Sequence, residues 1–126
     1  MHVAVAKYPV EAPRDFAAFA EKQARLLSSI DHAGVGLAVL PEYLSLELAA
    51  ILPPTIHTHM HASMAALQPF HAAWRELYGN LAQRLCMHIV AGSYLVASGE
   101  GRYRNRSYWF APDGNSWFQD KLQLTG

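Results

Sequence analysis

The sequence contains almost no cysteine, no excess of either charge and no long apolar run. Cys86 is the only cysteine among 126 residues, which excludes an internal disulfide framework and is typical of a reducing compartment. Lys plus Arg number 10 and Asp plus Glu number 10, so the charge indicates neither nucleic acid nor an anionic membrane as a partner. The apolar runs are shorter than the roughly 20 residues of a membrane span, and the first residues lack a signal-peptide pattern. We therefore expect a cytoplasmic protein.

What the sequence does contain is a large apolar fraction, 52% of all residues, which predicts a folded core. The most informative stretch is Leu-Ala-Val-Leu-Pro-Glu-Tyr at 37–43. Its four apolar residues followed by Pro41 predict a buried strand that stops abruptly. Glu42 comes directly after that stop. Because α/β proteins place their chemistry at the carboxyl ends of strands, Glu42 is a candidate acid or base, and a solvated loop carboxylate is the alternative.

The rest of the chain alternates between strand and helix patterns, which predicts an α/β fold. We expect strands at 2–8, 37–40 and 89–96, helices at 15–32, 45–52 and 69–87, and a loop at 55–64. A strand–helix–strand unit with short connections makes the first two strands parallel neighbours. The runs 104–111 and 116–124 flank Pro-Asp-Gly-Asn, which predicts a β-hairpin.

Lys121 lies near the end of the second hairpin strand. A Lys in an apolar strand pattern commonly extends to solvent, and the alternative is a fixed cation that stabilises an oxyanion. His57, His59 and His61 alternate, so an extended segment would present them on one face, where imidazoles can bind zinc or copper. No acidic residue or cysteine adjoins them, which favours a polar loop. Cys86 ends an apolar helix, and we expect a buried, inert thiol.

Five stretches together resemble the carbon–nitrogen hydrolase (nitrilase) superfamily. They are Val-Ala-Val-Ala-Lys-Tyr-Pro at 3–9, Val-Leu-Pro-Glu-Tyr at 39–43, Ile-Val-Ala-Gly-Ser at 89–93, Arg-Asn-Arg-Ser-Tyr-Trp-Phe-Ala-Pro-Asp-Gly at 104–114 and Asp-Lys-Leu-Gln-Leu-Thr at 120–125. The resemblance covers essentially the whole chain in the right order. It implies that residues 1–126 are the N-terminal portion of an α-β-β-α sandwich. A single sheet from such a sandwich would leave apolar patches exposed.

The resemblance also implies a Glu-Lys-Cys triad, with Glu42 as the general base and Lys121 stabilising the tetrahedral intermediate. The family's nucleophilic Cys lies downstream of the Lys, so we expect it beyond Gly126, and Cys86 does not fill the role. Asn105 matches an Asn of the family's strand motif, and we expect it to be a structural hydrogen-bonding residue rather than a substrate contact.

On this interpretation the chain is an inactive fragment of an enzyme that cleaves an amide, nitrile or carbamoyl group. The resemblance implies no cofactor and no metal, and a homo-oligomer when the protein is full length. A half-domain that acts as a binding or assembly module, and completes its sheets with another chain, is the alternative.

Overall fold

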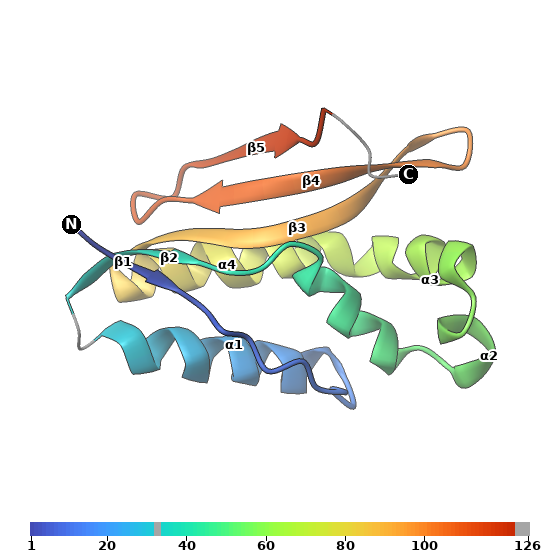
Figure 1. Ribbon diagram of the computed structural model, residues 1–126, viewed down its shortest axis with the longest axis horizontal. Helices are drawn as coiled ribbons and strands as arrows, with labels where there is room; N and C mark the ends of the chain where they lie inside the picture. Colours follow the sequence, from blue (N-terminus) through green and yellow to red (C-terminus); the bar gives the residue numbers. More distant parts are fainter. Residues whose placement is uncertain (32–33, 123–126) are drawn as a thin grey trace.

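The computed structural model describes residues 1–31 and 34–122, which form one mixed sheet with helices packed against it (Figure 1). The strands are β1 (His2–Val5), β2 (Val35–Val39), β3 (His88–Gly99), β4 (Arg102–Phe110) and β5 (Ser116–Asp120). The helices are α1 (Phe16–Asp31), α2 (Pro54–His57), α3 (Met60–Leu67) and α4 (His71–Leu85), with 3₁₀ helices η1 (Leu44–Ile51) and η2 (Gln68–Phe70). Among the described residues, no helix is long and apolar enough to cross a membrane.

The strands follow one another in the order β1-β2-β3-β4-β5 across the sheet. β1, β2 and β3 are parallel, and β4 and β5 add antiparallel neighbours at the far edge. The predicted α/β class, the parallel first two strands and the hairpin are therefore confirmed. Asp15 caps the N-terminus of α1, since the Ala18 N–H donates to Asp15 Oδ1 at 2.7 Å.

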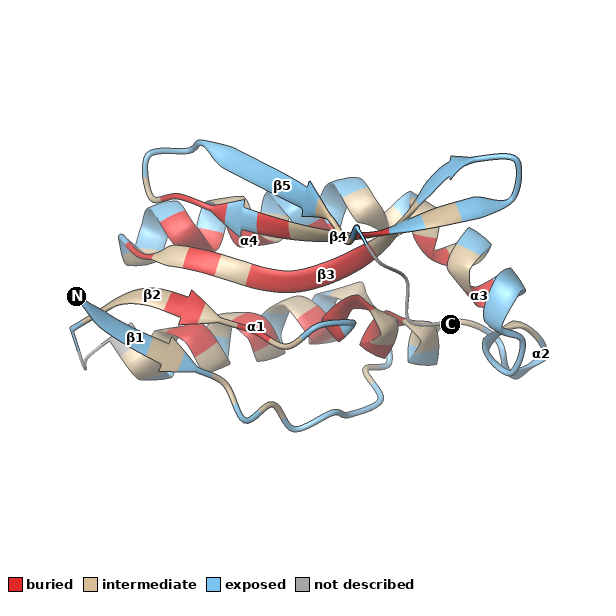
Figure 2. Ribbon diagram, turned by 45° about the horizontal axis from the view of Figure 1, so that its top comes forward, coloured by how far each residue is buried: buried red, intermediate tan, exposed pale blue. Residues whose placement is uncertain are grey.

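Helices α1 and α4 contact each other and cover the same face of the sheet (Figures 1 and 2). On that face Ala38, Ile89 and Phe110 are register neighbours on β2, β3 and β4, and all three are buried. Trp74 and Tyr78 of α4 are buried with them. The hydrophobic core therefore lies between the sheet and these two helices.

The opposite face of the sheet, here called the open face, carries an apolar row with one residue from each strand. Successive register pairs place Val5, Val39, Val90, Trp109 and Trp117 side by side. Trp109 and Trp117 are 44% and 54% exposed. The expectation that apolar patches are exposed on a strand face is thus confirmed.

The prediction of a loop at 55–64 is wrong, because α2 and most of α3 lie there. Pro54 opens α2, where a missing N–H costs nothing, and Ser63 and Leu67 of α3 are buried against the core. His57 ends α2, His59 precedes α3 and His61 is helical, so the segment is not extended and the condition for a shared face of the three His is not met. In the described part of the chain, no three His, Cys, Asp or Glu side chains are arranged to hold a metal ion.

Cys86 is exposed, so the prediction of a buried thiol is also wrong. Helix α4 ends at Leu85, and Cys86 adopts a left-handed conformation with φ of 50°, which turns the chain toward β3. Met87 takes the buried position instead. The helix predicted at 45–52 is present as the 3₁₀ helix η1, and β5 ends at Asp120. His32, Gln123 and Leu124 lie outside the described residues.

Candidate active site

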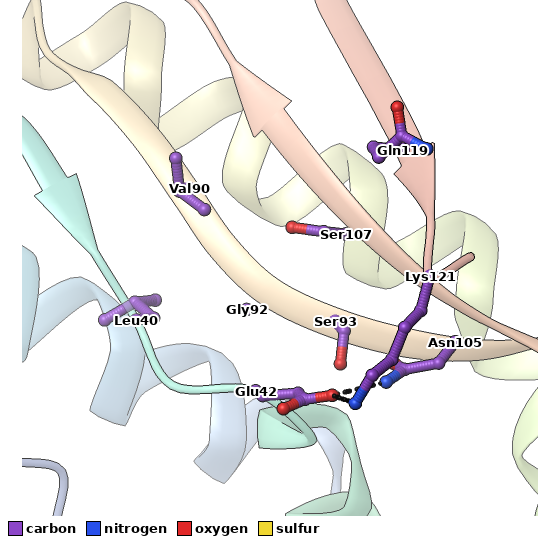
Figure 3. Close-up of a pocket in the computed structure, with 9 residues that line it drawn as sticks. All are labelled: Leu40, Glu42, Val90, Gly92, Ser93, Asn105, Ser107, Gln119 and Lys121. Atoms are coloured by element: carbon purple, nitrogen blue, oxygen red, sulfur yellow. Dashed lines mark hydrogen bonds and ion pairs between the residues drawn. The ribbon is translucent and has the colours of Figure 1, made fainter. Parts of the chain in front are cut away.

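Glu42 lies in the sharp turn that follows β2 (Figure 3). The Leu40 N–H donates to the Val90 carbonyl at 2.9 Å, which continues the pairing with β3 for one more residue. Pro41 cannot donate to the sheet and ends the strand. Tyr43 then adopts a left-handed φ of 63°, and its N–H donates to Ser93 Oγ at 2.9 Å. The turn therefore presents Glu42 at the carboxyl end of β2, as the sequence predicts.

Gly92 allows β3 to approach this turn closely. Its φ is +75°, and a Cβ built on it would lie 2.1 Å from the Pro41 carbonyl oxygen. The adjacent Ser93 is fixed from its other side, because Ser45 Oγ donates to its carbonyl oxygen at 2.8 Å. Gly92 and Ser93 of β3 therefore hold the turn on either side of Glu42.

Lys121 is the first residue after β5, and two contacts fix this end of the hairpin. Its N–H donates to the Asn105 carbonyl oxygen at 2.9 Å. The preceding Asp120 accepts two hydrogen bonds from the Arg106 guanidinium, at 2.7 and 3.1 Å. These bonds from Arg106 lower the pKa of Asp120 below its ordinary value. The Lys121 side chain thus leaves a well-defined backbone position.

The side chains of Glu42 and Lys121 meet, with Lys121 Nζ 3.1 Å from Glu42 Oε1 (Figure 3). Asn105 Nδ2 donates to the same oxygen at 2.6 Å. The carboxylate of Glu42 therefore contacts both the ammonium of Lys121 and the amide of Asn105. The pKa of Glu42 is lowered by the hydrogen bond from Lys121 and then by that from Asn105, and desolvation opposes both only in part. Glu42 is consequently ionised at neutral pH and can accept a proton.

The pair lines a pocket of about 280 Å³. Its other polar walls come from Asn105, Ser93, Ser107 and Gln119, and its apolar walls from Leu40, Val90 and Gly92. Ser107 and Gln119 are register neighbours on β4 and β5, two residues along from Trp109 and Trp117. Because side chains alternate across a strand, the pocket opens on the same face as the apolar row.

Glu47 is the most deeply buried acid near the site, and no sequence motif predicts a role for it. Its side chain is only 2% exposed. Its carboxylate accepts from Tyr8 Oη at 2.7 Å, from the Glu11 N–H at 3.0 Å and from Lys22 Nζ at 2.9 Å. Burial, followed by the hydrogen bond to Glu47, raises the pKa of Tyr8. The sequence feature that could have indicated its role is that Glu47 is the only acid within the apolar segment Leu44–Ile51.

This network ties η1 to the chain that enters α1 and to α1 itself. Gln23 Nε2 donates to Tyr8 Oη at 2.6 Å, and Tyr78 Oη donates to Gln23 Oε1 at 2.8 Å, which extends the network to α4. The segment that follows Glu42 is thereby anchored in the helical layer. A second pocket, of about 430 Å³, lies between Tyr8, Glu47 and the Glu42 turn.

The chain has the fold of solved structures from the nitrilase, or carbon–nitrogen hydrolase, superfamily. No family model and no curated protein matches the sequence. A cysteine-to-serine variant of the Nesterenkonia AN1 amidase from this superfamily aligns with a TM-score of 0.65 and 16% identity, over 100% of this chain and 45% of that chain.

A CN-hydrolase superfamily protein of Xanthomonas campestris, with an arsenic adduct in its active site, aligns with a TM-score of 0.56 and 23% identity. That alignment covers 89% of this chain and 37% of the other. The chain therefore spans less than half the length of the solved structures that it matches. The resemblance drawn from the sequence is confirmed at the level of the fold.

Proposed function

We propose that residues 1–126 are the N-terminal part of a carbon–nitrogen hydrolase that cleaves an amide, nitrile or carbamoyl group through a Cys thioester. The observation that carries the proposal is the 3.1 Å contact between Glu42 and Lys121 in a pocket at the carboxyl end of β2. The comparisons support an amide in particular. Variants of the Nesterenkonia amidase form complexes with acrylamide and with butyramide, and acrylamide adds to its active-site cysteine.

In the proposed reaction with an amide, the Glu42 carboxylate takes the proton of the thiol, because the thiolate is the effective nucleophile. The thiolate attacks the amide carbon, and the Lys121 ammonium stabilises the negative charge that develops on the carbonyl oxygen. The leaving amine takes the proton from Glu42 as the C–N bond breaks. Glu42 then accepts a proton from water, the hydroxide attacks the thioester carbon, and the departing thiolate recovers that proton.

The nucleophile in this proposal lies outside the 126 residues. Cys86 follows α4 and does not line the pocket that contains Glu42 and Lys121. The pocket opens on the open face of the sheet, so we expect the segment with the nucleophile to approach from that side.

The test is hydrolysis of small amides and nitriles by the longer protein that contains this chain. Glu42→Gln and Lys121→Ala should each abolish turnover without changing the melting temperature, whereas the exposed residues Glu21 and Lys7 should tolerate Glu21→Gln and Lys7→Ala. Wild-type rates in either pocket variant would remove that residue from the mechanism. The 126-residue chain alone should show no turnover, and hydrolysis by the pure chain would contradict the proposed location of the nucleophile.

The apolar row on the open face favours a second candidate, a binding or assembly module that completes its sheet with another chain. If this candidate is correct, the 126-residue chain forms a defined complex or oligomer in sedimentation experiments. In that case Trp109→Ser with Trp117→Ser also dissociates the complex, and the longer protein hydrolyses none of the substrates. A monomeric chain would exclude this candidate.

A further inference from the structure

The two hydrogen bonds to Glu42 end on the same carboxylate oxygen. Asn105 Nδ2 lies 2.6 Å and Lys121 Nζ 3.1 Å from Oε1 (Figure 3). Within residues 1–31 and 34–122, Oε2 receives no hydrogen bond. The two oxygens are therefore not equivalent: Oε1 is held, and Oε2 is available to exchange a proton.

Asn105 is the more rigid of the two donors. It is 5% exposed and lies inside β4, where it pairs with Leu95 of β3. Lys121 lies after the last residue of β5, and its side chain has four rotatable bonds against two in Asn. The backbone of Lys121 is itself held by the Asn105 carbonyl oxygen. One residue thus fixes the carboxylate through its side chain and the Lys through its main chain.

The Oδ1 atom of Asn105 lowers the stability of the folded state. Asn105 Oδ1 is buried, and it has no hydrogen-bond partner in the described part of the chain. A buried acceptor without a partner costs about 1–3 kcal/mol. A buried polar group without a partner calls for an explanation, and the hydrogen bond that Nδ2 donates to Glu42 provides one.

We propose that Asn105 is a positioning residue that anchors Oε1 of Glu42 and thereby makes Oε2 the oxygen that exchanges the proton with the nucleophile. This inference rests on the proposed function of Glu42 as the base. A carboxylate held at one oxygen keeps the other at a fixed place in the pocket. Misplacement of a reacting group by about 1 Å costs on the order of 100-fold in rate.

The first experiment needs no turnover. The side-chain carboxyl carbon of Glu42 is followed by NMR through an acid titration of the 126-residue chain, as wild type, Asn105→Leu and Asn105→Asp. Loss of a donor should move the Glu42 titration to higher pH in Asn105→Leu, and the added negative charge should move it further in Asn105→Asp. Asn80→Leu, on the exposed side of α4, is the matched control and should leave the titration unchanged. An unchanged Glu42 titration in both folded Asn105 variants would overturn the inference.

The second experiment uses the longer protein. Asn105→Leu should lower kcat about 100-fold with KM nearly unchanged, and the acidic limb of the kcat/KM profile should move to higher pH. A melting temperature close to wild type would separate positioning from folding. If Glu42→Gln is inactive but Asn105→Leu keeps wild-type kcat and pH profile, the positioning role is wrong and the proposed function stands. If Glu42→Gln keeps wild-type rates, the proposed function fails, and the positioning role that rests on it fails too.

Discussion

Glu42 and Lys121 are 79 positions apart in the sequence, and their charged groups lie 3.1 Å from one another. Their meeting depends on the order of the strands, because β3 and β4 lie between β2, which ends at the Glu42 turn, and β5, which ends beside Lys121. Glu42 and Lys121 are 50% and 32% exposed, so their attraction adds little to stability. Stability therefore gives little reason for the pair, which agrees with the chemical role proposed for it.

We predict that Gly92→Ala is strongly destabilising and displaces the Glu42 turn. The new methyl group would meet the Pro41 carbonyl oxygen at 2.1 Å, and the positive φ adds backbone strain. Together these effects should lower the free energy of unfolding by about 3 kcal/mol or more. Urea unfolding measures the change.

Gly101→Ala is the matched control for this substitution. Gly101 has a similar φ of +71°, but a Cβ there would meet nothing within 4 Å. Gly101→Ala should therefore lower the free energy of unfolding only by the strain of a left-handed backbone, about 1–2 kcal/mol. Equal effects of the two substitutions would show that the close approach of β3 to Pro41 is unimportant.

We predict that Glu47→Ala destabilises the protein by about 3 kcal/mol, since Lys22 loses its buried partner and keeps only Glu11 and the Pro9 carbonyl oxygen. Glu47→Gln keeps the volume and one acceptor, so it should cost less and provide a folded variant for comparison. Glu21→Ala, on the exposed side of α1, should stay within about 0.5 kcal/mol of wild type. A Glu47→Ala protein as stable as the Glu21→Ala protein would contradict a structural role for the network.

We predict that stability falls on acidification and that Asp120 contributes to the fall. The folded-state pKa values of Asp120 and Glu42 are lowered by Arg106 and by Lys121 respectively, below the value of about 4 expected for unfolded carboxyls. Their contributions are therefore complete above that value and are lost as the pH falls through the lower, folded-state values. The melting temperature of Asp120→Asn should depend less steeply on pH than that of wild type between about pH 5 and 2. Identical pH profiles for the two proteins would refute the contribution of Asp120.

Much of the fold could be predicted from short sequence patterns. Pro41 marks the end of β2, Asp15 caps α1, and the Pro-Asp-Gly-Asn turn forms the hairpin, because each depends on the conformational preferences of a few adjacent residues. The pairing of Glu42 with Lys121 followed only from the resemblance to a family, since no local rule relates residues so far apart. Helices α2 and α3 were missed because tertiary burial of Ser63 and Leu67 stabilises a segment with a weak helical pattern.

The contacts of single polar side chains were the least predictable part of the site. Asn105 was expected to be a structural hydrogen-bonding residue, but the sequence did not indicate that its partner is Glu42. Glu47 was not singled out at all, because its partners Tyr8 and Lys22 come from a different part of the chain. Such contacts are set by the packing of the elements and have no periodic signature in the sequence.

The apolar row that crosses the open face adjoins the pocket, and Val90 belongs to both. A second layer of protein that packs on this row would therefore also cover the pocket and exclude water from it. Removal of water would strengthen the attraction between the Lys121 ammonium and the Glu42 carboxylate, which lowers the pKa of Glu42, while desolvation of the carboxylate would raise that pKa. The covering of the open face and the final electrostatic environment of Glu42 would therefore arise together.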